Sequence, residues 1–193
     1  MRQVASAALL FALLGAAGPL ADPDWPCQQL LVPTLTADTI WPDHTPTADW
    51  HADATVAALV AEVAPRSVPV EDGVARLVEF TRHAPSAELR AEAFAGLVSE
   101  TNAERGHVIE RLRGIGQRQR TLAANVKHAT TELRALSPDA PSEQKQEIVA
   151  RRALLIREYE AVNSTIRYAC EVPADLESRL GRFAQVLSAG LPE

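Results

Sequence analysis

The chain has 193 residues, with 19 basic and 25 acidic side chains and a formal net charge of −6. This acidic balance disfavours nucleic acid as a partner, because binding to a phosphate backbone relies on a surplus of positive charge. The two cysteines form neither a C-x-x-C pair nor a C-x-x-C-H haem sequence, which disfavours a redox or metal–thiolate centre.

Residues 1–21 have the pattern of a secretory signal peptide. A basic start, Met1-Arg2-Gln3, precedes an uncharged run over residues 4–18 that is rich in Ala and Leu. The run is shorter than the roughly 20 apolar residues that a membrane span needs. Cleavage after Ala17 or after Ala21 fits the pattern, and a retained N-terminal anchor is the alternative. We therefore expect a periplasmic or secreted protein.

Only Cys27 and Cys170 remain after the predicted cleavage. In an oxidising compartment, two thiols most simply form one disulfide. The chain-entropy model gives about 4–5 kcal/mol, as an upper figure, for closing a loop of this length. We predict this bond as a structural one.

Residues 22–48 contain five prolines and show little hydrophobic periodicity. Proline fixes the backbone while the apolar residues need cover, so we predict an extended segment packed on a helical body. The residues expected in a groove on that body are Leu30, Leu31, Val32, Leu35, Ile40 and Trp41. Trp25, Trp41 and Trp50 would form a ligand-binding ledge, or else cap the core of the body.

Helical periodicity predicts an all-α body over residues 49–107, completed by 171–193. We expect helices over 49–64 and 70–83 and a third helix that Ser86 caps. A C-terminal helix is predicted to open at Pro173.

Residues 108–170 predict an antiparallel coiled-coil hairpin that projects from the body. Apolar-seam positions recur at alternating steps of four and three, the spacing of a left-handed coiled coil. They fall at Val108, Leu112, Ile115, Gln119, Leu122, Val126, Ala129, Leu133 and Leu136, and again at Ile148, Arg152, Leu155, Tyr159, Val162, Ile166 and Ala169. Such a hairpin is about 40 Å long. Gly114 and Gly116 inside it predict either a bend near its base or a close helix contact.

The predicted hairpin is basic although the chain is acidic. Residues 109–168 carry eleven basic and seven acidic side chains. The candidate interaction residues are Arg111, Arg113, Arg118, Arg120 and Lys127. An acidic protein partner, a second copy of the chain or an anionic membrane surface would suit them. The alternative is that these side chains only solvate the helices and pair with neighbouring glutamates.

The remaining candidate chemistry is weak, and no catalytic constellation or cofactor motif is present. Glu104 and His107 have the i, i+3 spacing of a carboxylate-bridged di-iron ligand pair, but no second copy of the motif occurs. A weak set of metal candidates lies near the end of the extended segment: Asp43, His44, Asp49, His51 and Asp53. Helix capping and solvation explain the acids equally well.

These patterns lead to two hypotheses, and the sequence resembles no family on which to choose between them. The first is an exported, non-enzymatic binding or scaffold protein that uses its basic hairpin to engage a protein partner or to self-associate. The alternative is a small-ligand or metal-ion binding protein that uses residues 22–53.

Overall fold

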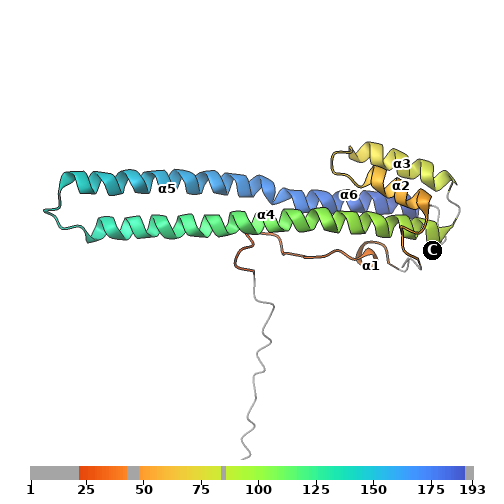
Figure 1. Ribbon diagram of the computed structural model, residues 1–193, viewed down its shortest axis with the longest axis horizontal. Coiled ribbons are helices and arrows are strands. Elements are labelled where there is room, and N and C mark those ends of the chain that lie inside the picture. The colour runs from red at the N-terminus through yellow and green to blue at the C-terminus, as the bar shows by residue number, and fades with distance from the viewer. Residues whose placement is uncertain (1–21, 43–47, 84–85, 190–193) are drawn as a thin grey trace, which may run out of the picture.

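The computed structural model describes residues 22–42, 48–83 and 86–189, and all regular structure within these ranges is helical. The all-α prediction is therefore confirmed. The predicted signal peptide and the metal candidates Asp43 and His44 lie outside the described residues. The helices, labelled in Figure 1, are α1 (Ala37–Ile40), α2 (Ala54–Val63), α3 (Val70–His83), α4 (Ala87–Ala135), α5 (Ser142–Ala169) and α6 (Glu171–Ser188).

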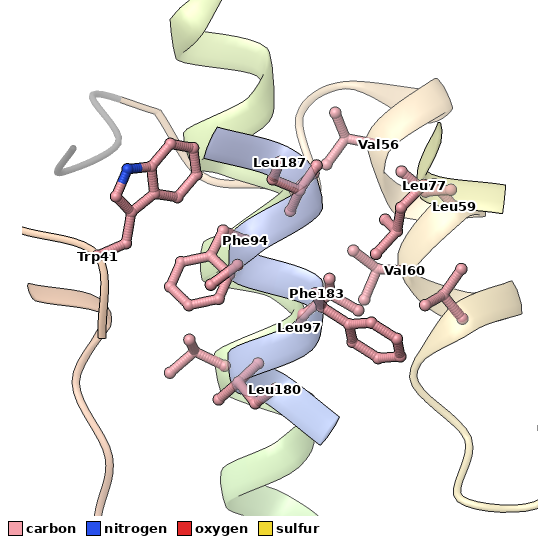
Figure 2. Close-up of a cluster of buried hydrophobic side chains, with 14 residues drawn as sticks. Trp41, Val56, Leu59, Val60, Leu77, Phe94, Leu97, Leu180, Phe183 and Leu187 are labelled. Atoms are coloured by element: carbon pink, nitrogen blue, oxygen red, sulfur yellow. The ribbon is translucent and has the colours of Figure 1, made fainter. Parts of the chain in front are cut away.

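A helical body forms at one end of the molecule, where α2, α3 and α6 pack with the first half of α4 (Figure 1). Its core consists of apolar side chains from facing helices, as expected for amphipathic helices that bury their apolar stripes. Figure 2 shows Phe94 of α4, Phe183 of α6 and Val60 of α2 within it. Trp41 is buried here as well, with its ring edge-on to Phe94 at 5.6 Å between centroids.

Helix α4 belongs to both the body and the hairpin. It runs for 49 residues, or about 74 Å at 1.5 Å per residue. Ser86 caps its start by accepting a hydrogen bond from the Leu89 N–H at 3.1 Å. The predicted boundary between residues 107 and 108 falls inside this helix, so the chain has no break between body and hairpin on this side.

The second half of α4 lies beside α5 in an antiparallel hairpin, which we call the arm (Figure 1). Leu122 of α4 is buried against Val162 and Ile166 of α5. Polar pairs share the interface: Gln119 donates to the Asn163 side chain at 2.5 Å. Polar pairs of this kind within a helix–helix seam favour one register of the two helices over others.

Two helix starts differ from those predicted, and local structure explains both. Helix α2 begins at Ala54 rather than at residue 49, because the Asp53 carboxylate accepts hydrogen bonds from the N–H groups of Thr55 and Val56. Helix α6 begins at Glu171 rather than at Pro173, with only Cys170 between it and α5. Cys170 has helical dihedrals, φ −70° and ψ −15°, so α5 and α6 follow each other almost directly.

Residues 22–42, which we call the strap, run along α4 and include the short helix α1 (Figure 1). The prediction that their apolar side chains all lie in a groove is wrong for two of them. Leu30 is 87% exposed and Val32 is 43% exposed, whereas Leu31 between them is half-buried. Successive side chains of an extended chain point to opposite sides, so only alternate residues of this stretch face the helices.

Candidate functional site

Two arginines of α4 hold the start of the strap. Arg113 donates from Nε to the Asp22 carboxylate at 2.7 Å and from Nη1 to Glu110 at 2.6 Å. Arg120 forms an ion pair with Asp24 and also donates to the backbone carbonyl of Pro23. The acidic start of the strap is therefore bound to the basic side of the arm.

Gly116 provides the space for this contact. A Cβ atom built at this position would lie 2.1 Å from the backbone oxygen of Asp24, far inside van der Waals contact. The nearest neighbour of this glycine is thus the strap, a contact that the sequence did not predict. Gly114, two residues earlier on the same helix, has open space where a side chain would stand.

Further along, the strap is fixed at the junction of α5 and α6. Cys27 and Cys170 form a disulfide with their Cα atoms 5.6 Å apart. Gln29 donates to the backbone oxygen of Cys170, and the Trp25 indole donates to the Gln29 carbonyl at 2.8 Å. Side-chain and backbone contacts therefore support the covalent link.

The ion pair between the strap and α4 shifts both of its ionisable groups. The hydrogen bond from Arg113, together with the Asp24 backbone N–H, lowers the pKa of the Asp22 carboxyl below its ordinary value. The same contact with Asp22 raises the pKa of Arg113. Both groups are therefore held more firmly in their charged forms.

The five predicted interaction residues separate into two groups. Arg113 and Arg120 contact the strap, a role that sequence reasoning missed. Arg111, Arg118 and Lys127 are exposed and form no ion pair with any residue that the structure describes. A signal for the first group was available, since Asp22 and Asp24 lie close in sequence to Cys27, whose partner Cys170 was expected at the base of the arm.

Arg113 and Arg120 are the first two members of a basic stripe on α4. Lys127 and Arg134 follow at the same seven-residue spacing, and both are exposed. Seven residues advance a helix by about 10.5 Å and bring side chains back to nearly the same face. We call these four residues the basic stripe. Arg113 and Arg120 bind the strap, and Lys127 and Arg134 lie closer to the tip of the arm.

A pocket of about 620 Å³ opens between the strap and the region where α4, α5 and α6 meet. Its apolar wall includes Trp25, Leu31, Ile109, Ile166 and Pro173. The side chain of Arg105 also lines it, although that side chain is only 2% exposed. Glu177 and Arg167 supply further polar groups at its edge.

The other predicted site residues have local roles. Asp49 accepts hydrogen bonds from the backbone and ring of His51, which lower the pKa of its carboxyl, and Asp53 caps α2. Within the described ranges, no group of three or more His, Cys, Asp or Glu residues is placed to hold a metal ion. Trp41 and Trp50 pack with the body core, whereas Trp25 lines the pocket, so the three tryptophans form no common ledge.

Glu104 and His107 lie one turn apart on α4 and line a shallow surface hollow with Glu100. The described helices bring no second pair of this kind to them. Nothing in their surroundings distinguishes them from ordinary surface residues.

The chain was compared with models of known protein families, with curated proteins and with solved structures, and it matches none of them. None of the described helices combines the length and the apolar character required to cross a membrane. Function must therefore be inferred from the strap, the basic stripe and the pocket themselves.

Proposed function

We propose that this chain is an exported, non-enzymatic binding protein whose arm engages an acidic protein surface. Export is supported by the signal-peptide pattern of residues 1–21 and by the disulfide, a bond that persists in oxidising compartments. Within this proposal the compartment is the periplasm or the outside of the cell.

The observation that carries the proposal is the way in which the basic stripe holds the chain's own strap. Arg113 and Arg120 already bind two aspartates that lie on either side of a proline in an extended segment. Lys127 and Arg134 continue the same stripe, are exposed, and form no ion pair with the described part of the chain. A partner with similarly spaced acidic groups would extend along α4 the contacts that the strap begins.

A second copy of the chain is one such partner. Outside residues 109–168 the sequence is strongly acidic, so the body of one molecule would attract the arm of another. An anionic membrane surface is the other source of negative charge that the arm would meet after export. Self-association would raise the molecular mass in solution, whereas contact with a membrane would appear as binding to anionic vesicles.

The proposal is tested with poly-L-glutamate as an acidic model partner. The variant Lys127→Glu/Arg134→Glu changes the stripe, and Lys145→Glu/Arg157→Glu makes the same change of charge on exposed residues of α5. Biolayer interferometry at about 50 and 300 mM salt should show binding by the unmodified chain that weakens strongly with salt. The stripe variant should lose about tenfold more affinity than the α5 variant, because its cations lie in line with those that the strap uses.

Equal losses in the two variants would contradict the proposal, since the arm would then act only through its total charge. Light scattering at low salt detects self-association, and co-sedimentation with phosphatidylglycerol vesicles detects membrane contact. Binding to vesicles alone would exclude an acidic protein as the partner. Export is tested separately, by the mass of the chain recovered from the periplasm of an expressing bacterium.

A further inference from the structure

Arg105 is the most buried charged residue among those described, and its hydrogen bonding is incomplete. Its Nη2 donates to the backbone oxygen of Val32 at 3.0 Å and to the Glu177 carboxylate at 2.6 Å. Its Nε and Nη1 atoms have no acceptor among the described residues. A buried donor without a partner carries a desolvation penalty, larger for a charged group than for a neutral one.

This incompletely bonded guanidinium lies at the wall of the pocket under the strap. At about 620 Å³, the pocket has the size typical of small-molecule sites. Apolar side chains from the strap and from three helices form most of the wall around it. The site therefore offers hydrogen-bond donors at one point and apolar surface elsewhere.

Two side-chain amides that line the pocket are occupied, and the remaining polar residues Gln28, Arg167 and Glu171 are exposed, which restricts the ligand at the buried wall. Asn163 accepts from Gln119, and the Gln29 side chain donates to Cys170. What remains at the buried wall is a donor without an acceptor, so a ligand head group with acceptor oxygens and no donors of its own fits best. The Glu177 carboxylate already balances the charge of Arg105, so an uncharged ester carbonyl can be accommodated, and Arg167 at the edge of the pocket can balance the charge of a single carboxylate.

We propose that this pocket binds an acyl chain, with its carbonyl or carboxylate oxygens at Arg105 and its hydrocarbon against the apolar wall. The head group would take the N–H bonds that the described residues leave unmade. The hydrocarbon would be covered by the strap, whose Leu30 is exposed at the edge of the pocket. This binding site is separate from the basic stripe and does not depend on the partner proposed for the arm.

Calorimetric titration of the full, disulfide-bonded chain with dodecanoate, below the micelle concentration, tests the proposal. Dodecyltrimethylammonium has the same tail but no acceptor oxygen, and it should bind at least about tenfold more weakly, the loss expected for one charge-assisted hydrogen bond. Methyl decanoate carries the ester carbonyl without the carboxylate and without hydroxyl donors. Its affinity relative to decanoate distinguishes an acyl lipid from a free fatty acid as the natural source of the chain.

Two variants locate the site. Arg105→Met removes the donors while keeping a long apolar side chain, and it should reduce dodecanoate affinity about tenfold or more. Should that variant fail to fold, Ala174→Phe serves instead, because Ala174 is an exposed pocket residue of α6 where a large side chain fills the space. Ala150→Phe, at an exposed position of α5 outside the pocket, is its control and should bind normally.

Absence of saturable dodecanoate binding would overturn the proposal, and so would binding that Ala174→Phe leaves unchanged. Equal affinity for the trimethylammonium analogue would also overturn it, since the hydrocarbon alone would then account for binding.

Discussion

Gly114 and Gly116 are separated by one residue on α4 and have opposite surroundings, so they form a matched pair for mutation. At Gly116 a Cβ would meet the backbone oxygen of Asp24, which no side-chain rotation can move away. Gly116→Ala should therefore destabilise the protein by about 1–3 kcal/mol, the usual cost of overpacking. Gly114→Ala meets nothing and should stabilise the helix by up to about 1 kcal/mol.

Urea unfolding of both glycine variants measures these changes, and limited proteolysis reports whether the strap has left α4. Equal stability of the two alanine variants would show that the strap does not rest on Gly116 in solution.

The lowered pKa of the Asp22 carboxyl predicts how the strap responds to acid. Because contact with Arg113 lowers the folded-state pKa of Asp22, this ion pair contributes stability above the ordinary carboxyl pKa near 4 and loses it as the pH falls through the folded-state value. Asp49 and Glu71 are shifted in the same direction, so the total acid response of the protein is not specific to the strap. A variant is needed to isolate it.

Asp22→Asn should thus lower the urea midpoint at pH 6, and the difference from wild type should shrink as the pH falls below about 4 and through the folded-state pKa of Asp22. Unfolding curves of both proteins over this range provide the test. A difference between the two proteins that persists undiminished at pH 3 would mean that the contact with Arg113 is not ionic in origin.

At the scale of the helices, Arg179 of α6 fixes the end of α2. Its guanidinium donates to the carbonyls of Val63 and Pro65 at 2.7 and 3.2 Å, and to that of Val68 at 2.6 Å. Burial lowers the pKa of Arg179, yet the group stays charged in any usable buffer. The last carbonyl of α2, which has no partner within its own helix, thereby obtains one from α6.

Arg179→Met should therefore destabilise the body by about 1–3 kcal/mol for each carbonyl left unbonded in the interior. Arg182→Met is the matched control on the same helix, where the arginine forms only an exposed ion pair with Glu71 and should contribute about 0–1 kcal/mol. Thermal and urea unfolding would distinguish them, and similar losses in the two variants would contradict the role assigned to Arg179.

The helices were largely predictable because their signals are local, whereas the strap contacts were not. The seam positions from Val108 to Ala169 repeat at coiled-coil spacing, and each of them is buried or half-buried in the structure. The starts of α2 and α6 differ from those predicted because each depends on a single residue. The Asp53 cap sets the start of α2, and the helical conformation of Cys170 sets the start of α6. Asp22 meets Arg113 across 91 positions of sequence, a pairing that no local pattern indicates.

The pocket was harder to predict from the sequence than the strap contacts. Arg105 lies on the same helix as many exposed arginines, and nothing in its neighbours separates it from them. Its burial depends on where the strap crosses α4, which in turn depends on the disulfide and on Gly116. The predicted cysteine pair, the expected packing of Leu31 and the candidate ledge residue Trp25 were thus the sequence features that pointed toward the pocket.

For the whole molecule, the disulfide is expected to hold the strap more than the helices. Cys27 and Cys170 are 143 positions apart, so the chain-entropy model assigns the bond about 4–5 kcal/mol at most. The apolar contacts of the body and the seam are made without it. Reduction, or the variant Cys27→Ser/Cys170→Ser, should lower the urea midpoint and make residues 22–36 accessible to protease, while far-ultraviolet circular dichroism stays nearly unchanged.

A large fall in helicity on reduction would show instead that the arm depends on this bond. The reduced chain also separates the two proposals, because loss of the strap should abolish acyl binding and leave Lys127 and Arg134 in place.

The continuity of α4 through body and arm has a mechanical consequence. From residue 108 to its end, α4 extends about 42 Å with no hinge, and α5 returns to α6 through a single helical residue. A force applied at the turn between the arm helices is therefore transmitted along α4 and α5 to the core of the body, because neither helix path contains a flexible connection. The distance from the body to the tip of the arm therefore depends on the number of heptads in the arm helices, each of which adds about 10.5 Å.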